Sequence, residues 1–114
     1  DLHRRVTADL PDAVRATLVR RSPPTSPDAD SSWFEHLAGS VRSVRPDCRV
    51  APYVFSGGTD NKWFGELGIP TFGFTPLLLP DGFDFPGMFH GVDERVPVDA
   101  LAFGVRVLTD LFAR

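Results

Sequence analysis

The fold is decided by residues 49–60, which have the sequence Arg49-Val50-Ala51-Pro52-Tyr53-Val54-Phe55-Ser56-Gly57-Gly58-Thr59-Asp60. The first seven residues are mostly apolar, and so short a run before a turn predicts a buried strand. Pro52 places an end or an irregularity in that strand. After the glycine turn, three apolar residues between positions 63 and 67 predict a short helix that Gly68 stops. The stretch therefore predicts strand, turn and helix, a unit of an α/β layer.

Helical and extended patterns alternate on either side of this unit. Before it, a capping box of Ser32 and Glu35 begins a predicted helix that ends before Pro46. After it, the run 69–74 predicts a second strand, and Pro97 begins the clearest helix of the chain. The apolar residues expected on the buried faces are Trp33, Leu37, Val41 and Val44 in the first helix and Val98, Leu101, Val105, Leu108 and Phe112 in the last. The order helix, strand, helix, strand, helix predicts an α/β layer with parallel strands.

The first part of the chain has a different character. An apolar stripe at Leu2, Val6 and Leu10 starts with the first residues and predicts a helix that is cut at its beginning, and alternation over 14–18 predicts a strand. Residues 22–30 contain three prolines and almost no apolar side chains, which is typical of a linker. We therefore expect a domain boundary there, with 1–21 on one side and 31–114 on the other.

Composition excludes several classes of function. The net charge is −3, with 12 basic and 15 acidic residues scattered among each other, so no basic stripe favours nucleic acid as a partner. No apolar run approaches the roughly 20 residues that span a bilayer, which predicts a soluble protein with no membrane partner. The single cysteine, Cys48, forms no internal disulfide and is compatible with a reducing compartment, so a cytoplasmic location is expected.

Two segments have residue types that carry chemistry. Gly57, Gly58, Thr59 and Asp60 form a turn at a helix entrance, where free amides favour anions. Lys62 is either solvated, as a lone surface lysine usually is, or placed to meet a substrate carboxylate. From composition alone, a plain chain reversal is favoured over a binding turn. His90 precedes Asp93 and Glu94, so it is a metal ligand, an acid or base, or part of a helix-entry cluster. The structural role is favoured here, because a zinc site takes three or four ligands and no pair at a typical ligand spacing is present.

Three ordered segments change this weighting. They are Ser56-Gly57-Gly58-Thr59-Asp60, then Glu66-Leu67-Gly68-Ile69-Pro70-Thr71-Phe72-Gly73-Phe74-Thr75-Pro76-Leu77, then His90-Gly91-Val92-Asp93-Glu94-Arg95-Val96-Pro97-Val98. Together they resemble the C-terminal half of the family-twenty zinc metallopeptidases, which include glutamate carboxypeptidase, the aminoacylases, the desuccinylases and the Gly-X carboxypeptidases. The resemblance is strong from about Ser31 onward. It implies that 31–114 is the C-terminal part of an α/β catalytic domain, and that 1–21 is the last helix and strand of an α+β lid used for dimerisation.

The resemblance also implies roles for single residues. His90 matches the final ligand of a two-zinc site, while Gly57, Gly58, Thr59 and Asp60 match the turn that lines the substrate pocket. Many relatives have arginine where this chain has Lys62, which keeps the charge but loses the two parallel hydrogen bonds to a carboxylate. Asp93 and Glu94 match the motif and are assigned to loop and helix-entry support. No catalytic residue is expected in this chain, because the family's general base and other ligands belong to its N-terminal half.

The expected function follows from these assignments. The chain is interpreted as the C-terminal fragment of a zinc-dependent hydrolase that cleaves amide bonds in peptides or N-acyl amino acids, inactive without the N-terminal half of the same protein. A homodimer is a possible assembly. The long loop 77–89, rich in phenylalanine, either shapes a pocket for a hydrophobic group or covers the core. The alternative function is a non-catalytic assembly module that inherited the fold.

Overall fold

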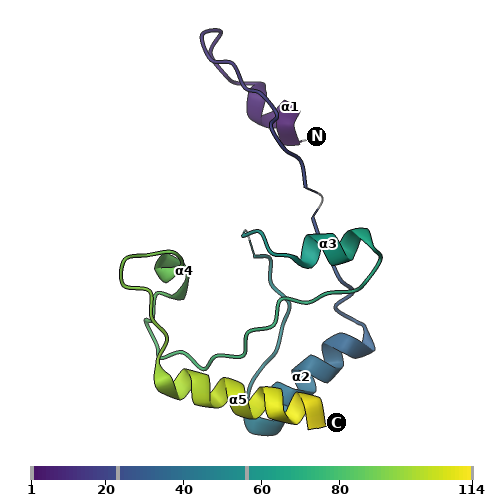
Figure 1. The fold of residues 1–114 in the computed structure, drawn as a ribbon, viewed down its shortest axis with the longest axis vertical. Coiled ribbons are helices and arrows are strands. Elements are labelled where there is room, and N and C mark those ends of the chain that lie inside the picture. Colours follow the sequence, from purple (N-terminus) through teal and green to yellow (C-terminus); the bar gives the residue numbers. More distant parts are fainter. Residues whose placement is uncertain (1, 23, 56, 114) are drawn as a thin grey trace.

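Two helices, α2 (Ser32–Val44) and α5 (Val98–Ala113), pack against each other and hold the core. They lie together at one end of the computed structural model, which describes residues 2–22, 24–55 and 57–113 (Figure 1). The buried apolar residues all come from these two helices; they are Ala38, Val41, Ala100, Phe103 and Val107. Val44, Cys48, Val50 and Phe74 pack against this cluster from its edge. Within the described ranges no other pair of helices is in contact. The two helices predicted most clearly are thus confirmed, and they form the one core.

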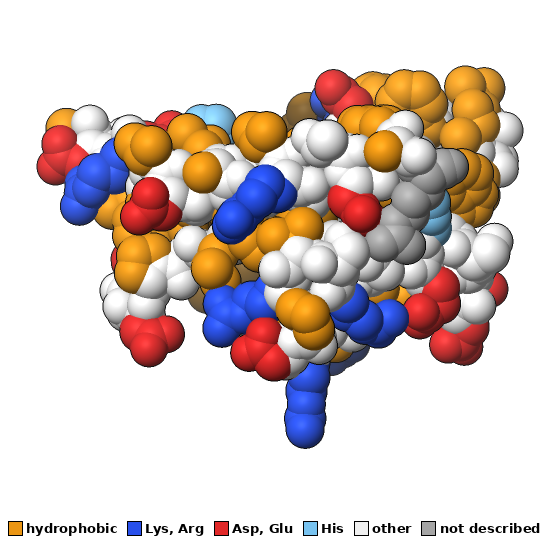
Figure 2. All heavy atoms as spheres, turned by 90° about the horizontal axis from the view of Figure 1, so that it is seen from below, with side chains coloured by type: hydrophobic (Ala, Val, Ile, Leu, Met, Phe, Trp, Pro, Cys, Tyr) orange, Lys and Arg blue, Asp and Glu red, His pale blue; other side chains and the backbone are white. Residues whose placement is uncertain are grey.

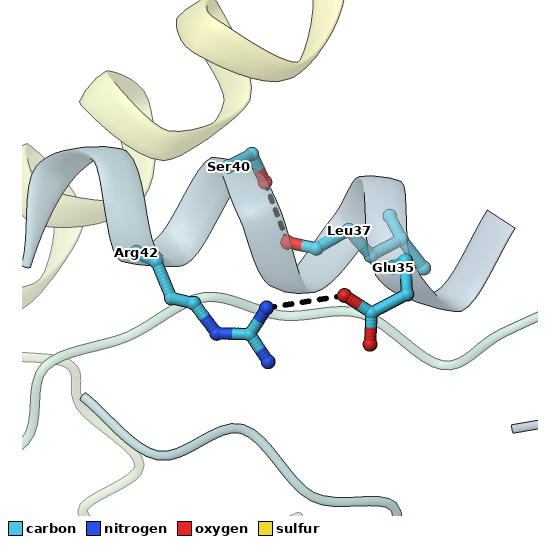
Figure 3. Close-up of polar contacts among 4 residues, drawn as sticks. All are labelled: Glu35, Leu37, Ser40 and Arg42. Atoms are coloured by element: carbon cyan, nitrogen blue, oxygen red, sulfur yellow. Dashed lines mark hydrogen bonds and ion pairs between the residues drawn. The ribbon is translucent and has the colours of Figure 1, made fainter. Parts of the chain in front are cut away.

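Helix α2 begins one residue earlier than the predicted capping box requires. Ser31 is the N-cap, and its hydroxyl accepts a hydrogen bond from the Phe34 amide at 3.3 Å while donating one to the Asp28 carbonyl at 2.6 Å. The carboxylate of Glu35 instead pairs with Arg42 two turns along the helix, at 3.2 Å (Figure 3). The capping-box prediction at Ser32 is therefore wrong, because the residue before it already satisfies the first helical amides.

Helix α5 buries the face opposite to the one predicted. Ala100, Phe103, Gly104 and Val107 are the buried residues of this helix, and the five residues predicted to be buried are all exposed, from Leu108 at 37% to Phe112 at 84%. Gly104 explains part of this choice. A Cβ atom at Gly104 would lie 2.6 Å from the carbonyl oxygen of Pro76. Only glycine therefore lets the segment around Pro76 cross the helix this closely. The helix is apolar on both faces, and periodicity alone does not decide which face meets α2.

The remaining three helices are short. Helix α1 (Leu2–Thr7) lies far from the α2 and α5 pair, and α3 (Asn61–Glu66) lies between them (Figure 1). Gly68, with a φ of 72°, closes α3 as predicted. Helix α4 (Phe85–Met88) interrupts the predicted loop 77–89. The carboxylate of Asp84 caps this helix by accepting from the Gly87 amide at 3.0 Å.

The predicted α/β class is wrong for the part of the chain that the structure describes. That part contains helices and no strand, so neither the parallel layer nor the strand of a lid is present. The segments predicted as strands, 14–18, 49–55 and 69–74, are single connections without a ladder of hydrogen bonds. A strand exists only when a neighbouring strand takes its backbone hydrogen bonds, and apolar content does not supply one. Pro23 of the predicted linker and Ser56 of the predicted turn lie outside the described residues, as do the two terminal residues.

The chain is open rather than closed on itself. Its radius of gyration is 18.4 Å, whereas a compact domain of this length has one of about 13 Å. Its accessible surface is 9511 Å², whereas a compact protein of this mass exposes about 6,200 Å². Seen from the end that α2 and α5 form, hydrophobic side chains cover much of the view, with charged groups among them (Figure 2). No helix within the described ranges is long and apolar enough to cross a membrane.

Candidate functional site

His90 lies directly after helix α4, in a backbone conformation that few residue types accept. Its φ is 57°, which makes it the one non-glycine residue with positive φ in the described chain. Hydrogen bonds on either side fix this turn: the Phe89 amide donates to the Pro86 carbonyl at 3.4 Å and the Gly91 amide to the Met88 carbonyl at 3.0 Å. The residue is exposed. Left-handed backbone at a non-glycine residue often marks a functional position, where the chain directs one side chain at the expense of stability.

Aromatic rings connect His90 to the segment that precedes the glycine turn. The Phe89 ring meets Phe85 at a centroid distance of 4.6 Å and Phe55 at 5.9 Å, both edge to face. Tyr53 contacts Phe55 in the same manner at 6.5 Å. We call these four residues the aromatic cluster. Since Phe55 lies two residues before Gly57 and Phe89 directly precedes His90, the cluster brings the two predicted site segments to the same part of the molecule.

The glycine turn is shaped by this contact. A Cβ atom at Gly57 would collide with the ring of Phe55, so glycine lets the ring fold back toward the turn. All four predicted turn residues, Gly57, Gly58, Thr59 and Asp60, are exposed. Thr59 accepts from the Asn61 amide at 3.4 Å, and the backbone carbonyl of Asp60 accepts from the Trp63 amide at 3.0 Å. The turn therefore presents its surface to solvent at the start of α3.

Lys62 lies in a separate concavity. Its ammonium group is 5.0 Å from the centre of the Trp63 ring, which the Arg20 guanidinium also approaches at 5.6 Å. Lys62 lines a cleft of about 460 Å³ between α3 and the proline-rich segment 24–28. Neither His90 nor the turn 57–60 lines this cleft. The structure thus brings the glycine turn toward His90 and directs Lys62 elsewhere.

The donor groups present do not make up a zinc site. Within residues 2–22, 24–55 and 57–113, no three side chains of histidine, cysteine, aspartate or glutamate are grouped closely enough to hold a metal ion. A structural or catalytic zinc ion needs at least three protein ligands, so His90 does not form such a site with the other described residues.

Sequence reasoning missed the part of the site made by Tyr53 and Phe55. Both were assigned to a buried strand, yet Tyr53 is 77% exposed and Phe55 is 48% exposed. The signal that points to Phe55 is a bulky ring two residues before Gly57, because such a pair permits the chain to fold the ring back over its own turn; no signal of this kind marks Tyr53.

The chain matches one family model over nearly its whole length. The model, described as peptidase family M20/M25/M40, matches residues 7–114. Aminoacylase-1 of Dictyostelium discoideum is 32% identical over 75 residues, which cover 61% of this chain and 18% of that protein. Aminoacylase-1 of Mus musculus is 27% identical, covering 78% of this chain and 20% of that protein.

A third relative is named for a different activity. The N-fatty-acyl-amino acid synthase/hydrolase PM20D1 of Homo sapiens is 31% identical over 91 residues, covering 77% of this chain and 18% of that protein. The chain therefore spans about a fifth of the length of the curated relatives it matches. No solved structure matches it.

Proposed function

We propose, since the chain belongs to the peptidase family M20/M25/M40, that it is the C-terminal part of a hydrolase that cleaves amide bonds in N-acyl amino acids or peptides. The observation that carries this proposal is the family match, which runs from residue 7 to residue 114. Relatives whose names denote aminoacylase or N-fatty-acyl-amino acid hydrolase activity favour N-acyl amino acids within this range of substrates.

The roles of single residues follow from the resemblance and are supported by the local geometry. His90 supplies one ligand to a zinc site whose other ligands come from outside this chain, and its exposed, left-handed position leaves the imidazole accessible for that purpose. The turn 57–60 lines the substrate pocket, which the contact between Phe55 and Phe89 supports. Lys62 holds the substrate carboxylate; this role requires its side chain to leave Trp63.

The missing parts of the enzyme explain the open surface of the chain. The general base and the remaining ligands are expected in the N-terminal half of the polypeptide, so the 114-residue chain alone is inactive. The excess of exposed surface over that of a compact protein supports a large interface with that half. The same surface also suits the alternative function, a non-catalytic assembly module, so the two are separated only by activity. The cytoplasmic location and the homodimer stay predictions.

The test uses the full-length protein and two histidine variants. His90→Ala is expected to lower the zinc affinity of one of the two metal positions, measured as a loss of bound zinc by atomic emission at limiting metal, and the hydrolysis of N-acetyl amino acids, each by roughly 100-fold. His36→Ala is the matched control, since His36 lies on α2 with its ring against Trp33 at 6.2 Å, and it is expected to change neither. Full zinc content and activity in His90→Ala would refute the ligand role. A wild-type protein that assembles without hydrolysing any amide would favour the assembly module.

A further inference from the structure

The aromatic cluster is held in place and still open. Phe55 and Phe89 are 48% and 40% exposed although each takes part in ring contacts on its own side of the cluster. Helix α4 fixes the position of Phe85, because Asp84 caps it and a Cβ atom at Gly87 would collide with that capping carboxylate. The cluster is thus an apolar surface whose rings contact one another and stay partly open to solvent.

Its position gives this surface a chemical context. Phe89 is covalently next to His90, and Phe55 lies beside the glycine turn, so an apolar group on the cluster would have its polar end close to the residues proposed for metal and substrate binding. The phenylalanine rings, arranged edge to face, leave edges and flat faces that take hydrocarbon groups, and they offer no hydrogen-bond donor to a carboxylate. An acyl chain therefore suits this surface, and the charged amino acid part of a substrate does not.

We propose that Phe55, Phe85 and Phe89 form the subsite for the acyl group of the substrate and select long hydrocarbon chains over short ones. This inference rests on the proposed function, since it assigns one half of an N-acyl amino acid to a surface beside His90. The cluster sets chain-length preference; it takes no part in bond cleavage.

The experiment compares three matched variants of the full-length protein. Phe55→Leu and Phe85→Leu each remove a ring of the cluster, and Phe112→Leu removes one from the exposed face of α5. The substrates are the N-acetyl and N-lauroyl derivatives of one amino acid. The ratio of kcat/KM for lauroyl to that for acetyl is expected to fall about tenfold in the two cluster variants and to stay unchanged in Phe112→Leu. Calorimetric titration with lauric acid, which needs no catalysis, is expected to give weaker binding in the same two variants.

Each outcome decides a different claim. If both substrates are affected equally in the cluster variants and lauric acid binds as in the wild type, the rings only pack against the rest of the protein and the subsite is refuted. If the wild type hydrolyses neither substrate but binds lauric acid in a manner that depends on Phe55 and Phe85, the subsite stands and the proposed hydrolase function fails. A melting temperature measured for every variant identifies one that has lost its fold, and Phe85→Met then replaces it.

Discussion

The pair of helices α2 and α5 and the aromatic cluster are both apolar, but the chain completes only one of them. Between the helices, Ala38, Ala100 and Val107 are fully buried and Phe103 nearly so. In the cluster, Tyr53 is 77% exposed although its ring has a partner at 6.5 Å. Ring contacts alone therefore do not make a core; a second layer must close over them. Between the helices, the chain itself supplies the second layer of side chains. At the aromatic cluster, the second layer has to come from another molecule or from the rest of the protein.

The largest effect is expected from breaking the closed region. Phe103→Ala removes the largest side chain between α2 and α5, and such truncations lower the free energy of unfolding by about 3 kcal/mol or more. Urea unfolding of the 114-residue chain, followed by far-ultraviolet circular dichroism, should give this loss or the disappearance of the folded state. Phe112→Ala, on the same helix at 84% exposure, should cost less than about 0.5 kcal/mol. Equal losses for the two phenylalanines would contradict the observed orientation of α5.

A smaller loss of stability is expected where the extended segment around Pro76 crosses helix α5. Gly104→Ala places a methyl group 2.6 Å from the Pro76 carbonyl oxygen, and the clash should outweigh the helix propensity gain of about 1 kcal/mol, leaving a net loss of about 1–2 kcal/mol. Gly73→Ala is the matched control, because nothing lies within 4 Å of a Cβ atom there. The same urea titration measures both variants. A Gly104→Ala variant that is more stable than the wild type would show that the segment around Pro76 does not pack against α5.

The smallest effect is expected at the entrance to α2, where the linker meets the helix pair. Ser31→Ala removes the cap on the Phe34 amide and should lower stability by about 1 kcal/mol. Ser32→Ala, one residue later and exposed, should change it by a few tenths at most. Thermal unfolding measures both variants. A larger loss of stability in Ser32→Ala than in Ser31→Ala would support the capping box predicted at Ser32 and Glu35.

Local signals allowed the helices other than α4 to be predicted, whereas contacts between distant segments did not follow from the sequence. Capping residues, apolar spacing and Gly68 were enough to locate α2, α3 and α5 within a few residues. The predicted strands were wrong for a physical reason. An apolar run such as 49–55 indicates that burial of the segment is favourable, but it does not indicate that a neighbouring strand is present to pair with it. The face of α5 was wrong because both of its faces are apolar, and only the crossing at Gly104 distinguishes them.

The candidate site divides in the same way. The resemblance located the glycine turn and His90 from ordered motifs, and the structure brings the two segments together through Phe55 and Phe89. Their roles in binding stay predictions. Lys62, adjacent to the turn in sequence, faces Trp63 and a different cleft, because the first turn of α3 rotates it away from its neighbours. The helix period separates these side chains in the structure, and the role of Lys62 in binding a carboxylate stays a prediction.

The left-handed backbone at His90 carries a cost in stability at the residue for which a metal-binding role is proposed. Glycine adopts a φ of 57° without the steric penalty that a side chain brings, which is of order 1–3 kcal/mol, and asparagine tolerates it better than most residues. Replacing the histidine by glycine would therefore relax the fold while it removes the imidazole. A screen for thermal stability alone would select against this histidine, whereas the ligand role proposed for it predicts that a screen for activity would retain it.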